Sequence, residues 1–257
     1  MKKEITIVKI GGNVIDNSDL LSQILSDFTS LSGSKILIHG GGKLASELSS
    51  DLGIESQFHE GRRITSSGEL KIVTMVYSGW INKSIVAELQ SRGANALGLC
   101  GADGNVLQAR KRSIAEVDFG HVGDIVNVNA SFISKLLEQE IVPVFSAITH
   151  DGQGGLLNTN ADTIACKIAQ ALVSEYTVKL IYCFEKQGVL FDENDSNSIL
   201  PTISKPEFKS WSDNGILHSG ILPKIQNCFD AKDAGVKEVH ITHALNLHLL
   251  NPKTSFQ

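Results

Sequence analysis

Two lysines occupy positions that are unusual for a cation. Lys9 lies two residues before the pair Gly11 and Gly12, in the otherwise apolar stretch EITIVKI. Lys224 falls in the first turn of a predicted helix entered through Pro223, where the helix dipole disfavours a positive charge. A neighbouring anion would explain both positions. For Lys9 the alternative is a residue at a strand edge that points to solvent.

Polar residues gather at positions 158–162, NTNAD, directly before another predicted helix. Asn160 alone could be an ordinary N-cap, and Asp162 an acid of the first turn that the helix dipole favours. Two asparagines and an aspartate within five residues are more than one cap requires. The stretch is therefore a candidate ligand contact, with Asn158, Asn160 and Asp162 as its members.

A glycine turn interrupts residues 35–47, KILIHGGGKLASE, between a short apolar strand and a helical pattern. Because Gly40, Gly41 and Gly42 carry no Cβ, the backbone can approach a ligand closely there. The helix that follows offers unpaired N–H groups and the positive end of its dipole, so an anion is the expected guest. A tight turn without a ligand is the alternative. The chain repeats the strand–glycine–helix pattern at residues 4–31, which favours the anion site.

The elements that must position these residues alternate between strands and helices. Apolar periodicity predicts helices at 18–31, 43–52, 68–90, 130–139, 205–213 and 222–234, and another after the NTNAD stretch. Apolar, β-prone runs predict strands at 4–10, 36–39, 94–99, 141–147, 178–184 and 236–242, with shorter extended pieces at 106–112 and 120–128. The stretch 58–65, with a glycine and two arginines, is predicted to be a hairpin or a loop. This alternation predicts an α/β fold with parallel crossovers and helices on both faces of one sheet.

Composition excludes several classes of function. The chain has 257 residues, 42% of them hydrophobic, and a net charge of −5, which argues against a nucleic-acid partner. The basic triplet at 110–112 is expected to be a solvated strand end, and His240 and His243 to lie at the surface.

Cys100, Cys166, Cys183 and Cys228 are far apart and form no CxxC pair, so buried free thiols in a reducing compartment are expected. No apolar stretch is long enough for a signal peptide or a membrane span, and we expect a cytoplasmic protein without a membrane partner.

Stock nucleotide fingerprints are absent from the sequence. Gly42 and Lys43 are followed by Leu44, where a Walker loop needs Ser or Thr, and no GxGxxG occurs. Phosphate binding would therefore use a different scaffold.

Seven motifs, in order, carry a resemblance to a known family. VKIGGN, HGGGK, GRRIT, GLCGADG, HVG, LNTNAD and the lysine of GILPK resemble the amino-acid kinase family, and within it the kinases that act on N-acylglutamate. The resemblance covers essentially the whole chain. It implies an open three-layer αβα sandwich with a mainly parallel sheet. One kinase domain would bind the acyl amino acid in an N-terminal lobe, about 1–173, and ATP in a C-terminal lobe, about 174–257.

The implied reaction moves the γ-phosphoryl group of ATP, which carries Mg²⁺, to the side-chain carboxylate of an N-acyl-L-glutamate, the second step of arginine biosynthesis. In it, Lys9 and Lys224 contact the transferring group from either side and Asp162 orients them. The resemblance assigns substrate binding to Gly41, Gly42, Arg63, Asn158 and Asn160. It assigns the nucleotide to Gly11, Gly12, Glu185, Gly188, Val189, Leu190, Ile216, Leu217 and His218. A glutamate-type carboxylate, with a pKa of about 4.3, is already ionised at pH 7 and needs no general base.

Two departures from the family pattern bear on the substrates. Glu185 stands where the family usually has Asp, which leaves the nucleotide contacts of that turn open. Gly61-Arg62-Arg63 replaces the usual Gly-Leu-Arg, so Arg62 falls beside the acyl pocket, where it could pair with an acyl carboxylate. N-acetyl-L-glutamate and N-succinyl-L-glutamate both remain open as substrates.

The sequence also bears on the oligomeric state and on two alternative functions. The chain lacks the N-terminal extension that the resemblance associates with hexameric forms, so a homodimer is expected. One rival is another kinase of the fold, for aspartate, glutamate, carbamate or UMP. The other is a non-catalytic sensor of nucleotide or amino acid, against which the presence of both Lys9 and Lys224 argues.

Overall fold

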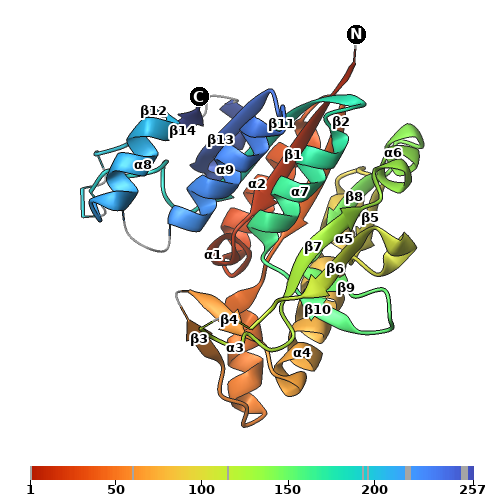
Figure 1. The fold of residues 1–257 in the computed structure, drawn as a ribbon. Coiled ribbons are helices and arrows are strands. Elements are labelled where there is room, and N and C mark those ends of the chain that lie inside the picture. The colour runs from red at the N-terminus through yellow and green to blue at the C-terminus, as the bar shows by residue number, and fades with distance from the viewer. Residues whose placement is uncertain are drawn as a thin grey trace.

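A large, mainly parallel sheet runs through the molecule (Figure 1). The structure is a computed structural model that describes residues 2–59, 61–114, 116–192, 194–195, 197–217, 221–249 and 254–257. The strand order is β12-β14-β13-β11-β1-β2-β8-β5, and only the pair of β13 and β14 is antiparallel. These strands are β1 (Lys3–Ile10), β2 (Ser34–His39), β5 (Ala96–Leu99), β8 (Val142–Phe145), β11 (Tyr176–Phe184), β12 (Thr202–Ile203), β13 (Glu238–His243) and β14 (Thr254–Phe256).

Helices cover both faces of this sheet, which gives three layers. In Figure 1, α7 (Ala161–Leu172) and α9 (Leu222–Asp233) lie side by side over the near face, while α2 (Ser18–Ser30) and α5 (Asn82–Ser91) pack against each other on the far face. The remaining helices are α1 (Gly12–Ile15), α3 (Gly42–Asp51), α4 (Ser67–Val73), η1 (Thr74–Ile81), η2 (Asp103–Asn105), α6 (Ala130–Glu138), α8 (Lys205–Asp213) and η3 (Ala244–Leu249). The predicted α/β sandwich is confirmed.

The central strand β1 holds the two halves of the chain together. It pairs with β2 on one side, from Ile5 opposite Ser34, and with β11 on the other, from Lys3 opposite Tyr176. Its apolar side chains are buried, as expected for a strand covered on both faces. Residues from both halves therefore share one hydrophobic core.

The prediction of a single sheet is wrong. Four short strands form a second, mostly antiparallel sheet with the order β10-β9-β6-β7. They are β6 (Leu107–Lys111), β7 (Gly123–Val128), β9 (Ile148–His150) and β10 (Leu156–Asn158). A hairpin of β3 (Gln57–His59) and β4 (Arg62–Ile64) stands apart from both sheets. Strands of three to six residues carry too few side chains to show which sheet they join.

The long helix predicted at 68–90 is continuous, but its middle turns are a π-helix, η1. The wider turns place Tyr77 and Ile81 against the glycine turn after β2. Gly41 has φ +151°, and a Cβ there would lie 2.3 Å from Ile81 Cδ1. Glycine is therefore required at this position on two counts, backbone conformation and space.

Three minor expectations can be judged from the same description. The four cysteines are free, as expected; Cys166, Cys183 and Cys228 are buried, whereas Cys100 is only half-buried. The surface position expected of His240 is wrong, because the residue is only 8% exposed and its Nε2 lies 3.1 Å from Glu238 Oε2. Within the described ranges no helix is long and apolar enough to cross a membrane.

Candidate active site

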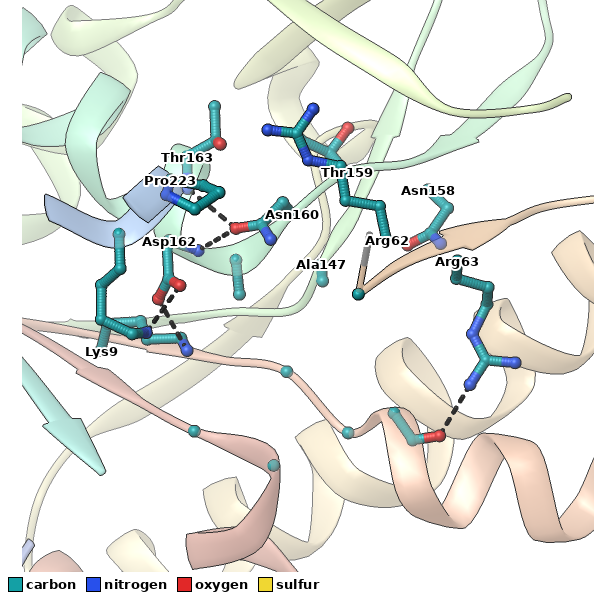
Figure 2. Close-up of a pocket in the computed structure, with 18 of the residues that line it drawn as sticks. Lys9, Arg62, Arg63, Ala147, Asn158, Thr159, Asn160, Asp162, Thr163 and Pro223 are labelled. Carbon is teal, nitrogen blue, oxygen red and sulfur yellow. Dashed lines mark hydrogen bonds and ion pairs between the residues drawn. The ribbon is translucent and has the colours of Figure 1, made fainter. Parts of the chain in front are cut away.

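A cavity of about 620 Å³ opens at the carboxyl ends of β1, β2 and β11. In an open α/β sheet this edge is where ligands bind, because the chain diverges there to opposite faces. Twelve of the predicted site residues line the cavity: Lys9, Gly11, Gly12, Gly41, Gly42, Arg62, Arg63, Asn158, Asn160, Asp162, Glu185 and Lys224. Figure 2 shows many of these side chains converging from separate elements.

The carboxylate of Asp162 joins two lysines from opposite ends of the chain. Lys9 Nζ lies 2.7 Å from Oδ1 and Lys224 Nζ lies 2.8 Å from Oδ2 (Figure 2). The side chains of all three residues are 15% exposed or less. Tyr182 fixes the first turn of α7 by donating a hydrogen bond from its hydroxyl to the Asp162 carbonyl, at 3.2 Å. The group carries one net positive charge at the edge of the cavity.

Burial and the charges within this triad shift the pKa values of its three groups in different directions. Burial alone would raise the pKa of Asp162, but the charges of Lys224 and Lys9 outweigh it and hold that pKa well below its usual range. Burial lowers the pKa of Lys9, while the ion pair with Asp162 opposes the shift. Burial also acts against the charge of Lys224, but Asp162 more than compensates and the pKa of Lys224 is raised.

The short helix α1 and the longer helices α3 and α9 all begin at the cavity without a side-chain cap at the N-cap residue. Among the described residues, no side chain accepts a hydrogen bond from the first turn of α3 or α9, and neither helix has an acid there. By contrast, side chains cap α2, α4, α6, α7 and α8. The free N–H groups at Gly42 and Lys43, together with the dipole of α3, make this end of the cavity suited to an anion.

A buried histidine is hydrogen-bonded to the glycine turn. His39 Nδ1 donates to the carbonyl of Gly40 at 2.8 Å, and His39 Nε2 accepts from Asn82 Nδ2 at 3.0 Å. Asn82 also donates to the carbonyl of Val144. Both His39 and Asn82 are fully buried, and burial lowers the pKa of His39 to about 4. The neutral ring is thus part of the scaffold that orients Gly41 and Gly42.

The lowered pKa of His39 predicts a specific loss of stability in acid. The unfolded chain takes up this proton at about pH 6.5 and the folded chain at about pH 4, so the unfolded state binds more protons between these values. The free energy of unfolding should fall as the pH falls through that window, by on the order of 3 kcal/mol from this group. Urea unfolding of the wild type and of His39→Gln, from pH 7.5 to 4, measures the difference.

His39→Gln removes the titrating group, so its stability should depend less on pH than that of the wild type. His59→Gln is the matched control, because His59 is exposed on β3. Equal pH dependence in wild type and His39→Gln would contradict the assignment.

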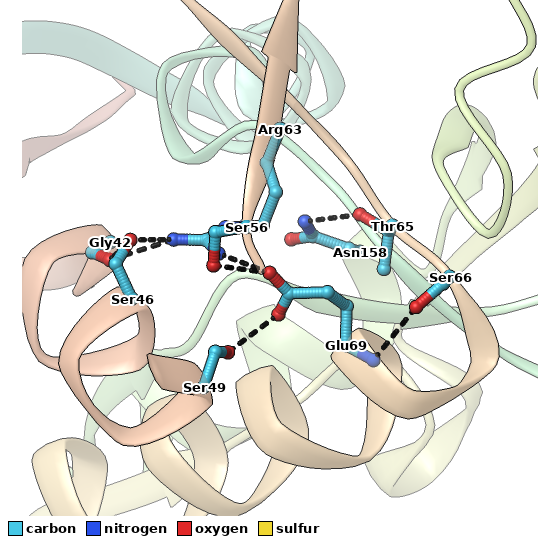
Figure 3. A network of polar contacts seen from close by, with 9 residues as sticks. All are labelled: Gly42, Ser46, Ser49, Ser56, Arg63, Thr65, Ser66, Glu69 and Asn158. Atoms are coloured by element: carbon cyan, nitrogen blue, oxygen red, sulfur yellow. Dashed lines mark hydrogen bonds and ion pairs between the residues drawn. The ribbon is translucent and has the colours of Figure 1, made fainter. Parts of the chain in front are cut away.

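Arg63 sits at the centre of a buried polar network (Figure 3). Nη1 donates to Ser56 Oγ and Glu69 Oε1, at 2.6 and 2.7 Å, and Nη2 donates to the Gly42 carbonyl and Ser46 Oγ, at 2.8 and 2.7 Å. Glu69 is 2% exposed. The four Nη hydrogens of Arg63 are therefore engaged, and the side chain ties the start of α3 to β4 and α4. A substrate contact at Nη1 or Nη2 would have to replace one of these bonds.

The two asparagines keep polar groups available to a ligand. Asn158 Nδ2 donates to Thr65 Oγ1 at 3.0 Å, while its Oδ1 accepts no hydrogen bond from the described residues. Asn160 Oδ1 caps α7 by accepting from the N–H groups of Asp162 and Thr163. The N-cap reading of Asn160 is thus correct, and its Nδ2 still borders the cavity.

Several predicted nucleotide residues lie away from this cavity. Gly188 and Val189 are buried, and the Val189 N–H donates to Thr254 Oγ1. Leu217 is 4% exposed and Ile216 40% exposed. None of these four, nor Leu190, lines the cavity. Their nucleotide contacts remain predictions, and His218 lies outside the described residues.

Other cavity residues had weak signals or none in the sequence. Arg112 was expected in solvent but lines the cavity, with its guanidinium on Asp124 at 2.6 Å. Tyr77 also lines it, and nothing in a helical stripe marks one aromatic residue as facing a ligand. Glu69 carried one signal, since Ser66 and Glu69 have the spacing of a capping box.

Comparison with known proteins covers nearly the whole chain. The model of the amino acid kinase family matches residues 4–243. The acetylglutamate kinase of Phocaeicola vulgatus is 52% identical over 244 residues, which is 95% of each chain. That of Bacteroides thetaiotaomicron is 51% identical with the same coverage. Among solved structures, smu.665 from Streptococcus mutans UA159 superposes with a TM-score of 0.78 at 27% identity, over 93% of this chain and 94% of that one.

Proposed function

Because this chain belongs to the amino acid kinase family, we propose that it transfers the γ-phosphoryl group of ATP to the side-chain carboxylate of an N-acyl-L-glutamate. The relatives at about 50% identity are named acetylglutamate kinases, which makes N-acetyl-L-glutamate the reference substrate and arginine biosynthesis the pathway. The observation that carries the proposal is the convergence of Lys9 and Lys224 on Asp162 beside the uncapped starts of α3 and α9. A binding module would not need two cations converging from distant segments.

The chemistry required of the protein is positioning and charge stabilisation. One oxygen of the substrate carboxylate bonds to the γ-phosphorus of ATP, and the bond from that phosphorus to the bridging oxygen breaks. ADP leaves with the electron pair, and the product is an acyl phosphate. Repulsion between carboxylate and phosphates is the main obstacle, and Lys9 and Lys224 reduce it as negative charge spreads over the transferring group. Asp162 keeps the two ammonium groups at fixed positions.

The two substrates would occupy different parts of the cavity. We place the acyl amino acid against α3 and the β3–β4 hairpin, within the first 173 residues, and ATP against β11 and α9, within 174–257. Asn158 Oδ1 can accept a hydrogen bond from the amide N–H of the acylated substrate. Gly41 and Gly42 can donate backbone N–H groups to the α-carboxylate of that substrate. Glu185, Gly11 and Gly12 line the cavity and would border the phosphates of ATP.

Mg²⁺ fits this site as an ion carried by ATP. The acids that line the cavity are Asp16, Asp162 and Glu185, and no three potential metal ligands gather among the residues that the structure describes. Mg²⁺ usually binds through substrate phosphates and water with few carboxylates, which suits such a wall. When bound, it would neutralise phosphate charge.

A coupled assay of ADP release tests the proposed reaction. We expect release with N-acetyl-L-glutamate, and none above background with L-glutamate, L-aspartate, carbamate or UMP. Hydroxylamine in the same mixture should trap an acyl phosphate as its hydroxamate. Phosphorylation of UMP or aspartate, or ATP binding without ADP release from any acceptor, would contradict the proposal.

We also propose that the enzyme is a cytoplasmic homodimer that pairs through η1 and the edge strand β5. Met75 is 54% exposed, Trp80 70% and Leu97 38%, and β5 leaves one edge of the large sheet unpaired. Exposed apolar side chains and an open sheet edge are each typical of an interface. The free cysteines agree with a reducing compartment.

Trp80→Asp should shift the protein from dimer to monomer, because a carboxylate would be buried at the apolar contact. Size-exclusion chromatography with light scattering measures the mass. Leu245→Asp on η3 is the control, since Leu245 is 44% exposed on another element. A monomeric wild type, or a Trp80→Asp protein that remains dimeric, would rule out this interface.

A further inference from the structure

Arg62 is a charged side chain in the cavity wall that the proposed reaction does not use. It is the first residue of β4, it is exposed, and it lines the cavity. No described residue forms an ion pair or hydrogen bond with its guanidinium. The guanidinium is therefore available to a partner from outside the protein.

Neighbouring Arg63 cannot be the same kind of residue, because successive side chains of a strand point to opposite faces. Figure 2 shows this for the two arginines. Arg63 turns toward α3, where its Nη hydrogens are engaged, while the guanidinium of Arg62 lies on the side of Thr159, Asn160 and Thr163. Among the residues that the structure describes, Glu69 thus balances the charge of Arg63, and no acid balances the charge of Arg62.

The other cations around the cavity have acids near them. Lys9 and Lys224 share Asp162 and are reserved for the phosphoryl group. Arg112 is paired with Asp124. Lys43 lies near Asp16, whose pKa is raised by burial while the charge of Lys43 opposes that shift. At the end of the cavity formed by β4 and the start of β7, the charge of Arg62 therefore has no acid assigned to it among the described residues.

This end of the cavity is also the end where an acyl group would lie. Beyond β4 the chain continues to Thr65, whose N–H donates to Phe119 and whose carbonyl accepts from His121. The next residue, Val122, forms a bridge with Asn158. Arg62, Val122 and Asn158 therefore belong to one wall, and Figure 2 places Arg62 and the Lys9–Asp162 pair on either side of Asn160. A glutamate whose side chain reaches the lysines would direct its acyl group toward this wall.

We propose that Arg62 selects an acyl group that itself ends in a carboxylate, and that the preferred acceptor is N-succinyl-L-glutamate. This inference rests on the proposed kinase reaction and names the substrate within it. A carboxylate on the acyl chain would form a two-point, charge-assisted pair with the guanidinium, whereas the methyl of an acetyl group offers a cation nothing to bind. The α-carboxylate has its own anion site on the opposite side of β4, at the start of α3.

Kinetics with three acceptors isolate the charge of the acyl group. N-succinyl-L-glutamate carries the extra carboxylate, N-succinamoyl-L-glutamate is its neutral counterpart of equal size, and N-acetyl-L-glutamate is the short reference. For the wild type we expect kcat/KM to be roughly tenfold to a hundredfold higher with the succinyl substrate than with either of the others. Arg62→Leu should erase or reverse that preference, and Arg62→Lys should retain part of it.

Arg110→Leu is the matched control, because Arg110 is exposed on β6 and does not line the cavity. It should keep the wild-type ratio of substrates. Circular dichroism checks that each variant is folded, and calorimetric titration with N-succinyl-L-glutamate checks the loss of binding in Arg62→Leu.

Three results would overturn the assignment. A wild type that prefers N-acetyl-L-glutamate, with Arg62→Leu unchanged, means that Arg62 stays in solvent. An equal loss for all three acceptors in Arg62→Leu means that Arg62 holds the α-carboxylate. A succinyl preference that survives Arg62→Leu places selection elsewhere. If no acceptor releases ADP, the proposed reaction itself fails, which is a separate outcome.

Discussion

Alanine in place of Lys9 or Lys224 is expected to lower kcat by about a hundredfold or more, with a smaller change in substrate binding. Each ammonium group lies on Asp162 at the cavity edge, where negative charge spreads over the transferring phosphoryl group. Donors that act on developing charge contribute chiefly to kcat, and losses on the order of 10²-fold or more follow their removal. Steady-state kinetics with ATP and the best acceptor measure both parameters.

Lys209→Ala is the control for loss of a lysine, since Lys209 is exposed on α8 and outside the cavity. Its kcat should match the wild type. An unchanged kcat in folded Lys9→Ala or Lys224→Ala would remove that lysine from the mechanism. A rise in KM alone would make it a binding residue.

Asp162→Asn is expected to impair turnover strongly while the fold is kept. The amide has the shape of the carboxylate but no charge, so Lys9 and Lys224 would repel each other across the site and leave their positions. The folded chain holds the pKa of Asp162 low, which means that the charged form is the one that the fold stabilises. The far-ultraviolet circular dichroism spectrum should therefore match that of the wild type, while kcat should be much lower.

The competing explanation is that Asp162 serves the N-terminus of α7 alone. Loss of a cap costs about 1 kcal/mol of stability and little activity. Asn17→Ala supplies that pattern for comparison, because Asn17 caps α2 through the N–H of Leu20. If Asp162→Asn melts at a lower temperature with kcat near the wild-type value, Asp162 has a structural role only.

Much of the fold could be predicted because its elements are long and strongly patterned. The run EITIVKI became β1, and the predicted bounds of α8 agree with the structure to the residue. The second sheet could not be predicted, since its register depends on partners far away in the chain. The π-helical turns of η1 also gave no signal, because a π-turn changes hydrogen bonding without changing residue types.

The candidate site likewise contains residues that the sequence predicted and residues that it did not. Lys9 and Lys224 were found because a lysine is unusual at each position, and Asp162 because it follows two asparagines within five residues. Their proximity in space then followed from the sheet edge. His39 and Glu69 were missed as supports of the site, because their partners Asn82 and Arg63 come from other elements. His240 was predicted to lie at the surface and is buried, because the burial of a strand residue depends on neighbours that come from elsewhere in the chain.

The position of β1 in the sheet also sets the order of events during synthesis. Its neighbour β11 begins 166 residues after Ile10, so the first strand to leave the ribosome waits for the second half of the chain before that edge is paired. At about 5–20 residues per second, the wait is roughly ten to thirty seconds. During it, an apolar strand with an unpaired edge stays open to misassociation, and chaperones would bind this nascent chain before Lys9 can meet Asp162 and Lys224.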